Sequence, residues 1–522
     1  MKFDPLSQFS PVSRSEWLEA VRKIGGADPG SLVWDAGEGF EAEAYQDRAG
    51  PGVRRDPLYH REEVKQLKIV EHAADDRDTG NMRFNSSGDG ECTPLIHARV
   101  HYNPGTGTWE SCGFPLSNSE DLRRWLSVSG ALRSTVFLDF GAAGPVLFSA
   151  LKKQISESVA QEDPLRHSSA GFHNLSLLFD PFTQLLDENS GIFTPEEVVQ
   201  MLPELLNPGG HSFCVDGTFY ANAGATLIEQ AAFITALFSE LLARLQPEER
   251  SQAAKRMLTR VSGGPLYFPE IAKLRAIRLL WGNLLRAFDL PENWKLEVIA
   301  ETSLLYKTGV DLENNLVRNT AETMASVAGG ADYLLIHPHT RPFQEQDAFP
   351  VRMADNLFHI LKEEAAADAV SDPAAGSYYI EYLTDLIAEK AWSLFQQIEA
   401  EGGFLEAIKK GSIQKRIRAS ADRRVQDVVS GERKILGANL YSVDSPGEQG
   451  APPEKKFTPL PSKSNPFRPA KESPLLRQWA DAQSRGVHIG DLLPPPNRTI
   501  EKVPMIRGGI AGAVNPQNPR QR

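Results

Sequence analysis

Two pairs of histidines have the spacing that a metal site or a proton-transfer site would need. His337 and His339 follow a predicted strand over residues 333–336, and catalytic residues of α/β barrels lie where strands end. Pro338 between them, and the lack of a nearby carboxylate cluster, argue against a metal pair, so a structural role is expected. His97 and His101 lie four residues apart in a strand-like run, and hence on one face. Because no third metal ligand is evident in the sequence for this pair, a structural role is again expected.

Asp216 and Gly217 follow another predicted strand, and this pair fits a ligand contact and a simple turn equally well. Longer motifs that carry a mechanism are missing from the sequence. It has no G-x-S-x-G nucleophile elbow, no H-E-x-x-H zinc helix, no EF-hand loop and no glycine-rich phosphate loop after a strand. The residues by themselves therefore indicate an α/β protein without an identifiable reaction.

The composition excludes several classes of protein. Hydrophobic residues make up 41% of the 522 residues, which excludes global disorder. Asp and Glu number 68 against 56 Lys and Arg, and this net charge of −12 argues against nucleic acid or an anionic membrane as the main partner. No apolar run is long enough to span a membrane, and no secretory signal is visible. The three cysteines, Cys92, Cys112 and Cys214, lack the spacing of a zinc site or a disulfide framework. We expect a protein of the reducing cytoplasm.

Short apolar runs alternate with longer helical runs over residues 56–437. The expected strands cover residues 94–102, 134–140, 175–179, 212–215, 265–268, 296–300 and 333–336. The expected helices cover residues 195–206, 225–245, 270–288, 317–327, 351–366 and 382–401. This alternation predicts a parallel α/β fold, either a closed (β/α)₈ barrel or a doubly wound open sheet.

The two ends of the chain differ from this middle part. Residues 1–55 form an expected arm, in which Ser13 and Glu16 have capping-box spacing before a helix, and a short strand-like piece around a turn follows. One helix and one hairpin bury little surface, so the arm is expected to pack on something else. Residues 438–522 form an extension, and residues 441–522 hold 14 of the 36 prolines, which excludes regular helices and central strands. This tail is either disordered or an extended segment on the barrel or on a partner, with one short helix over residues 473–483.

Five segments carry long motifs in a fixed order. Residues 268–288 follow the pattern F-x-E-I-A-K-x-R-A-x-R-x-x-W, and residues 300–335 follow A-x-T-S … D-x-x-N-N-x-V-R-x-T-x-E-x-M-A-x-V-x-G-G. Residues 363–385 match the surroundings of D-P-x-G-G-S-Y-Y-V-E except at Ala375, residues 398–417 match I-E-x-x-G-G-M-x-x-A-I, and residues 32–39 match L-V-W-x-x-x-E-G. Over about residues 30–435 the chain thus resembles the adenosylcobalamin-dependent acyl-CoA mutases, the methylmalonyl-CoA mutase family.

The resemblance implies a (β/α)₈ barrel that holds an acyl-CoA along its axis, and a radical reaction supplied by adenosylcobalamin. In the family's catalytic chains a separate C-terminal domain carries D-x-H-x-x-G, whose His ligates cobalt. The tail here has only G-V-H-I-G at residues 486–490, so no cobalamin-binding domain is expected. The family's R-P-W-T-x-R-Q-Y-A-G-F segment is missing from residues 55–100, and residues 175–188 stand in place of G-T-I-Q-N-D-x-x-K-E.

Four positions of this chain depart from the active pattern. Where active chains read G-Y-H-M-Q-E-A-G-A, Phe219 replaces the His that donates to the thioester carbonyl, and Asn222 replaces the Glu. Where active chains read G-G-T-Q-S-L-H, Asp332 and Leu335 replace the Gln and His that face the substrate. A phenylalanine or leucine side chain cannot donate a hydrogen bond or a proton. The resemblance thus implies four degenerate positions and no catalytic, cofactor-binding or metal-binding residue in this chain.

The resemblance therefore implies a non-catalytic small subunit of a heterodimeric methylmalonyl-CoA mutase. The catalytic large subunit would be the partner, would carry adenosylcobalamin and would be wrapped by the arm, while this chain would bind no cofactor. One alternative is a divergent active acyl-CoA mutase barrel that uses a separate cobalamin-binding chain. A second alternative is a barrel-based binding protein without a mutase partner.

Overall fold

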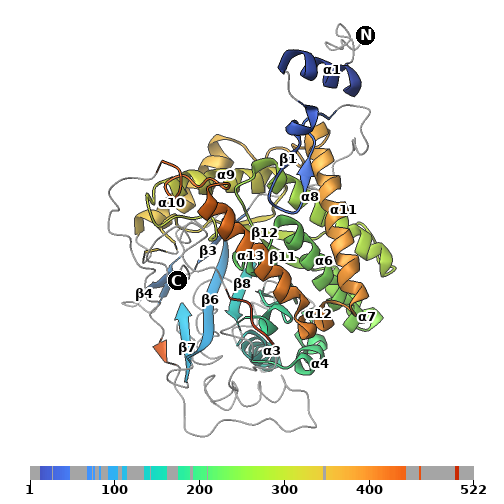
Figure 1. Ribbon diagram of the computed structural model, residues 1–522. Coiled ribbons are helices and arrows are strands. Elements are labelled where there is room, and N and C mark those ends of the chain that lie inside the picture. The colour runs from blue at the N-terminus through green and yellow to red at the C-terminus, as the bar shows by residue number, and fades with distance from the viewer. Residues whose placement is uncertain are drawn as a thin grey trace, which may run out of the picture.

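The computed structural model describes residues 12–25, 28–46, 68–72, 74–76, 81–83, 92–103, 108–113, 135–141, 143–160, 175–187, 192–207, 210–341, 343–344, 348–441, 458–459 and 500–504. In this part of the chain strands and helices alternate around a parallel sheet, which confirms the predicted α/β class (Figure 1).

Eight of the described strands run parallel and follow one another in chain order. They are β3 (Lys68–His72), β6 (Cys92–Asn103), β8 (Val136–Gly141), β9 (Leu175–Leu177), β10 (Cys214–Asp216), β11 (Leu258–Ser262), β12 (Glu297–Glu301) and β13 (Tyr333–Leu335). The last of them, β13, pairs in parallel with the first, β3. Between β9 and β10 the backbone N–H of Cys214 donates to the Phe179 carbonyl at 3.2 Å, and that of Leu177 donates to the His211 carbonyl at 3.4 Å.

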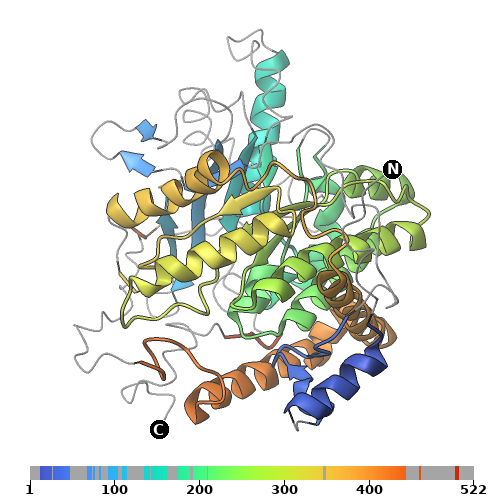
Figure 2. The same ribbon diagram turned by 90° about the horizontal axis from the view of Figure 1, so that it is seen from above.

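Helices lie along the outside of these strands, as Figures 1 and 2 show. They are α3 (Gly144–Ala160), α4 (Pro195–Leu205), α5 (Gly217–Asn222), α6 (Leu227–Arg244), α7 (Pro247–Ala254), α8 (Tyr267–Ala287), α9 (Asn314–Ala328), α10 (Ala348–His359), α11 (Tyr378–Ala400), α12 (Phe404–Lys410) and α13 (Ser412–Ser430). A capping box starts α6, because the Thr226 hydroxyl accepts from the N–H of Glu229 while the Glu229 carboxylate accepts from that of Thr226. None of the described helices combines the length and apolar composition that crossing a bilayer requires.

One predicted strand is wrong. Residues 265–268 contain the first residues of α8, which begins at Tyr267, and the strand of this region is β11, at residues 258–262. The sequence of β11, L-T-R-V-S, mixes polar and apolar residues, whereas P-L-Y-F looks like a buried strand. Arg260 of β11 pairs with carboxylates on other strands, as described below, and such pairing is invisible in a single sequence.

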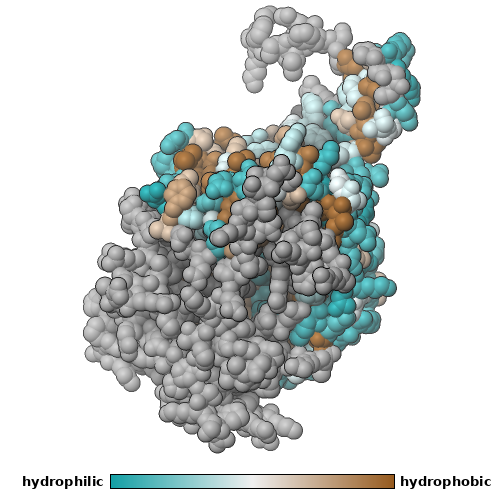
Figure 3. All heavy atoms as spheres, turned by 60° about the vertical axis from the view of Figure 1, so that its left-hand side comes forward, coloured by the Kyte–Doolittle hydropathy of each residue, from teal (hydrophilic) through white to brown (hydrophobic). Residues whose placement is uncertain are grey.

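The arm consists of α1 (Arg14–Gly25) and a hairpin of β1 (Trp34–Asp35) and β2 (Glu41–Ala42). The predicted cap is confirmed, since the N–H of Ser13 donates to the Glu16 carboxylate at 2.7 Å. The hairpin contributes Phe40 and Ala42 to a core cluster with α8 and α11. In contrast α1 stands at the edge of the molecule (Figure 1), and apolar side chains are visible on the surface of the arm (Figure 3).

Two short pieces of the proline-rich tail are described. β14 (Thr458–Pro459) pairs antiparallel with the edge strand β7 (Thr108–Gly113). Residues 500–504 run without regular structure, yet Ile500 and Val503 are buried in the main core. Both pieces thus lie against the rest of the described fold, and the helix expected over residues 473–483 lies outside the described residues.

Candidate functional site

One layer of buried apolar side chains connects the parallel strands. Side chains that belong to seven of the strands, or directly follow one, form a single cluster of buried residues in contact. These are Leu95, Phe137, Leu178, Cys214, Leu258, Ile299, Tyr333 and Leu335. The side chain of Leu335, one of the four positions expected to be degenerate, therefore lies in this layer, at 2% exposure.

A layer of charged side chains lies next to the apolar layer, toward the carboxyl ends of the strands. Because side chains alternate between the two faces of a strand, a residue two positions after an inward-facing one also faces inward. Two positions after members of the apolar layer stand Asp139, Asp180, Asp216, Arg260, Glu301 and His337. In α/β barrels this end of the strands is where active sites sit.

Arg260 holds this charged layer together. Its guanidinium donates to Glu301 at 2.5 Å and to Asp139 at 3.3 Å, and lies 3.7 Å from the carboxylate of Asp216. Burial alone would raise the pKa of the Glu301 carboxyl, but Arg260 and His337 outweigh burial and lower it to about 2. The three carboxylates of Asp139, Asp216 and Glu301 are therefore all paired with Arg260.

The other titratable groups of the two layers, including Cys214 of the apolar layer, are not poised for nucleophilic chemistry. Burial lowers the pKa of His337 to about 4, so the imidazole near Glu301 is neutral at pH 7. Burial raises the pKa of the Cys214 thiol well above its usual value, so it stays protonated. Asp180 has a pKa raised by burial to about 6, and its carboxylate accepts backbone N–H bonds from Phe182 and Thr183, each at 3.0 Å.

Phe219 lies in α5, directly after β10, with 6% of its surface exposed. Asp216 caps this helix, because its carboxylate accepts from the N–H groups of Thr218 and Phe219 at 3.0 and 3.2 Å. Gly217 is required for close approach, since a Cβ there would lie 2.5 Å from the side chain of Ile234. The pair Asp216 and Gly217 thus makes a strand-to-helix turn, and the ring of Phe219 packs in the core.

Asn222 and Asp332 lie apart from each other and from the inward layers. Asn222 ends α5, and its buried Oδ1 has no hydrogen-bond partner among the described residues. Asp332 precedes β13, at the end of the strand opposite the charged layer. Its carboxylate pairs with Arg278 of α8 at 3.0 Å and with Lys295. An ion pair with α8 thus fixes the carboxylate of Asp332.

The candidate histidines do not form a metal site in the described part of the chain, where no group of metal-ligating side chains has the arrangement to hold an ion. His337 belongs to the charged layer, and the ring of His339 packs at 6.3 Å from that of Phe349. His97 and His101 lie on β6, and their side chains are outside the described residues.

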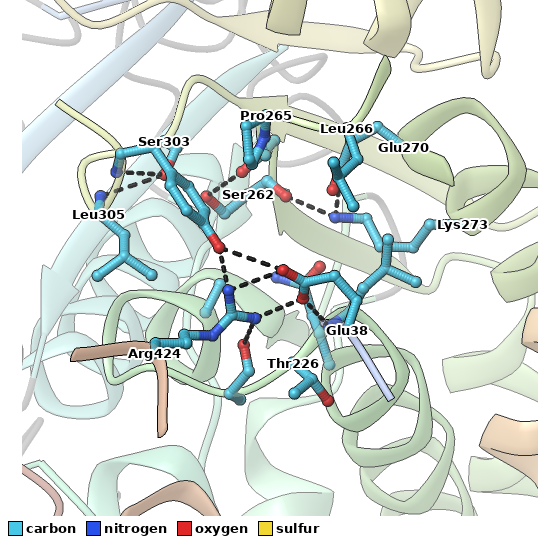
Figure 4. Close-up of a pocket in the computed structure, with 17 residues that line it drawn as sticks. Glu38, Thr226, Ser262, Pro265, Leu266, Glu270, Lys273, Ser303, Leu305 and Arg424 are labelled. Atoms are coloured by element: carbon cyan, nitrogen blue, oxygen red, sulfur yellow. Dashed lines mark hydrogen bonds and ion pairs between the residues drawn. The ribbon is translucent and has the colours of Figure 1, made fainter. Parts of the chain in front are cut away.

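A second buried ion cluster joins the arm hairpin to α6 and α13 (Figure 4). Glu38, at the turn of the hairpin, accepts from Arg424 at 2.8 Å, from Arg433 at 3.2 Å and from the N–H of Leu227 at 2.9 Å. Burial alone would raise the pKa of Glu38, but Arg424 more than offsets it, so the pKa is lowered. The adjacent cavity, of about 20 Å³, has room for roughly one water molecule and no acyl-CoA.

Sequence reasoning missed both ion clusters. For the charged layer a signal exists, because each charged residue stands two positions after an apolar strand residue. For Glu38 the signal is only its place in the matched segment over residues 32–39, and nothing in the sequence connects it to Arg424.

Comparison with known proteins places these observations in a family. The sequence profile of the family "Methylmalonyl-CoA mutase" matches residues 178–457. The chain is 31% identical to the "Methylmalonyl-CoA mutase small subunit" of Porphyromonas gingivalis, over 83% of this chain and 70% of that one. It is also 31% identical to the "Probable methylmalonyl-CoA mutase small subunit" of Mycobacterium bovis, over 69% of this chain and 59% of that one.

A third relative carries the other subunit name. The "Methylmalonyl-CoA mutase large subunit" of Streptomyces virginiae is 31% identical over 51% of this chain and 38% of its own length. The chain thus spans well under two thirds of that relative. The profile match over more than half of the chain, and the small-subunit relatives, show that this chain belongs to the methylmalonyl-CoA mutase family.

Proposed function

We propose that this chain is the non-catalytic small subunit of a heterodimeric methylmalonyl-CoA mutase in the cytoplasm. Its large partner subunit would interconvert methylmalonyl-CoA and succinyl-CoA. The observation that carries the proposal is the filled interior of the parallel strands. An apolar layer that includes Leu335 occupies the axis, and the charged layer around Arg260 is paired with itself.

The proposal includes three parts of the chain with different roles. Residues 56–437 form a closed (β/α)₈ barrel, supported by the chain-order pairing of eight strands and the β13–β3 ladder. Residues 1–55 form an arm for subunit contact, and residues 438–522 form an extension on the barrel surface. The relatives named small subunit and large subunit support a two-chain assembly.

The described residues do not fit adenosylcobalamin, the cofactor that the family implies. At the carboxyl ends of the described strands the imidazole of His337 lies 3.3 Å from Glu301, and that carboxylate is also paired with Arg260. We therefore assign the cofactor to the large partner, and this chain supplies no step of the radical chemistry.

Turnover of methylmalonyl-CoA by the isolated chain and by the complex tests the proposal. The isolated chain, given adenosylcobalamin and methylmalonyl-CoA, should form no succinyl-CoA, whereas the complex with a large mutase subunit should. Phe219→His alone should not create activity, because catalytic groups act as a unit and Leu335 still lacks a donor. Conversion by the isolated Phe219→His chain would contradict the proposal and favour a divergent active barrel.

A further inference from the structure

A groove of about 450 Å³ lies outside the ring of strands, between α11 and α13. Its two walls are helix faces, since the lining residues of α11 are Lys390 to Gln397 at helical spacing and those of α13 run from Arg416 to Arg424 in the same way. The turn of the arm hairpin and the first turn of α6, with Glu229, close one end. A volume of this size suits a small organic ligand.

The groove is positive although the chain as a whole has a net charge of −12. Lys390 is exposed, and among the described residues no carboxylate pairs with it or with Arg416. Arg423 adds a third cation, 3.6 Å from Asp35. The carboxylate in the lining, that of Glu229, is already bound by the Ser420 hydroxyl at 2.8 Å.

Arg416 is held in place by a neutral partner. Its guanidinium spans the groove and donates to Oε1 of Gln397 on α11 at 2.9 Å. A guanidinium fixed in this way keeps its charge and its other N–H donors for an anion, and its planar fork matches the geometry of a phosphate group. A lysine on the facing wall can add a second charge-assisted contact.

We propose that this groove binds a phosphate-bearing ligand, with the phosphate between Lys390 and Arg416. Apolar lining side chains, those of Ile228 and Leu394, would contact the organic part of such a ligand. Free phosphate and an organic phosphate share this chemistry. The site is distinct from the filled interior of the barrel and does not depend on the subunit role proposed above.

Calorimetric titration of the full-length chain with two probes, inorganic phosphate and adenosine monophosphate, tests the site. A titration with sodium chloride of equal ionic strength is the blank. Lys390→Gln and Arg416→Gln should each weaken binding about tenfold, since each removes a charge-assisted contact. The matched control is Lys415→Gln, which removes one exposed charge from the same helix outside the groove and should leave affinity unchanged.

Tighter binding of adenosine monophosphate than of phosphate identifies an organic phosphate as the ligand, and equal binding identifies free phosphate. Either result supports the site if the variants rank as expected. Lack of binding of both probes at millimolar concentration overturns the proposal, and so does equal weakening by the control. The Lys390 side chain is exposed and makes no ion pair with another described residue. Its variant should therefore fold like the parent chain, so that a loss of binding reports on the site.

Discussion

Glu38 is the residue by which the arm hairpin is fixed to the barrel, and it gives the first prediction. Its carboxylate is 4% exposed and faces the guanidinium groups of Arg424 and Arg433. Glu38→Gln leaves these two charges buried without their counterion. We expect the free energy of unfolding to fall by about 3–5 kcal/mol, measured by urea denaturation.

The matched control for this prediction is Asp35→Asn on the same hairpin. Asp35 lies 3.6 Å from Arg423, and both side chains are more than half exposed, at 57% and 65%. A surface ion pair of this kind contributes less than about 1 kcal/mol. If the two substitutions cost the same, Glu38 is not the anchor of the hairpin.

His337 gives a prediction about pH. Its folded-state pKa of about 4 lies below the ordinary value of 6.5, so the unfolded chain binds more protons between these two values. The stability this group contributes is complete above pH 6.5 and is lost as the pH falls toward 4, by up to about 3 kcal/mol. His337→Gln, which can still donate to Glu301, should lose less stability from pH 7 to pH 5 in denaturant titrations than the parent chain.

The control for the pH prediction is His359→Gln, at the last residue of α10 and outside the charged layer. This variant should keep the pH dependence of the parent chain. A parent-like pH dependence in His337→Gln would mean that other groups cause the acid sensitivity.

At the scale of single elements, the sequence predicted strands and helices where the pattern of polar and apolar residues is clean. β8, β9, β12 and β13, and also α4, α6 and α11, lie close to their expected ranges. β11 was missed because Arg260 breaks its apolar pattern, and the carboxylates that pair with Arg260 come from β8, β10 and β12. Such partners meet only after the ring has formed, so one strand's sequence cannot show them.

The four positions expected to be degenerate also differ in how far the sequence predicts where their side chains lie. Leu335 and Phe219 are apolar, and their burial could be predicted from residue type alone. For Asp332 the motif gave the alignment but not the direction of the side chain. The alternation of faces along β13 turns Asp332 toward Arg278, because Tyr333 and Leu335 already face inward.

The tail segment at residues 500–504 gives a prediction at the scale of an element. Val503 is 1% exposed, and its N–H donates to the Leu186 carbonyl at 3.0 Å. Lys502 adds a hydrogen bond to the Leu185 carbonyl at 2.7 Å. Val503→Asp buries a charge without a counterion, and we expect a loss of at least about 2 kcal/mol in unfolding free energy.

The control in the tail is Glu501→Gln. Glu501 pairs with Arg418 at 2.5 Å, but both side chains are about half exposed, so the expected loss is below about 1 kcal/mol. An equal, small loss for both substitutions would show that this segment rests on the barrel without stabilising it.

At the scale of the whole molecule, the arm is the part whose packing is incomplete. The hairpin is anchored by Glu38 and by Phe40 in the core, whereas Leu32, Val33 and Trp34 remain 37%, 42% and 39% exposed. The helix α1 packs Trp17 on Tyr45 within the arm itself, with ring centroids 5.0 Å apart. Apolar surface on a projecting segment marks it as a contact site for another chain.

The last prediction is that the arm holds the large subunit. An obligate pair of chains buries more than about 2,000 Å², so each chain should stabilise the other by mass action. Deletion of the chain up to Gly50 removes α1, the hairpin and Glu38, and should weaken the heterodimer.

The Glu38→Gln variant separates the causes, because it loosens the hairpin and keeps α1 with its apolar side chains. Analytical ultracentrifugation of the full-length, deleted and Glu38→Gln chains with the large subunit measures each affinity. If the deleted chain assembles as tightly as the intact chain, the arm has no part in the interface, and the exposed apolar residues need another explanation.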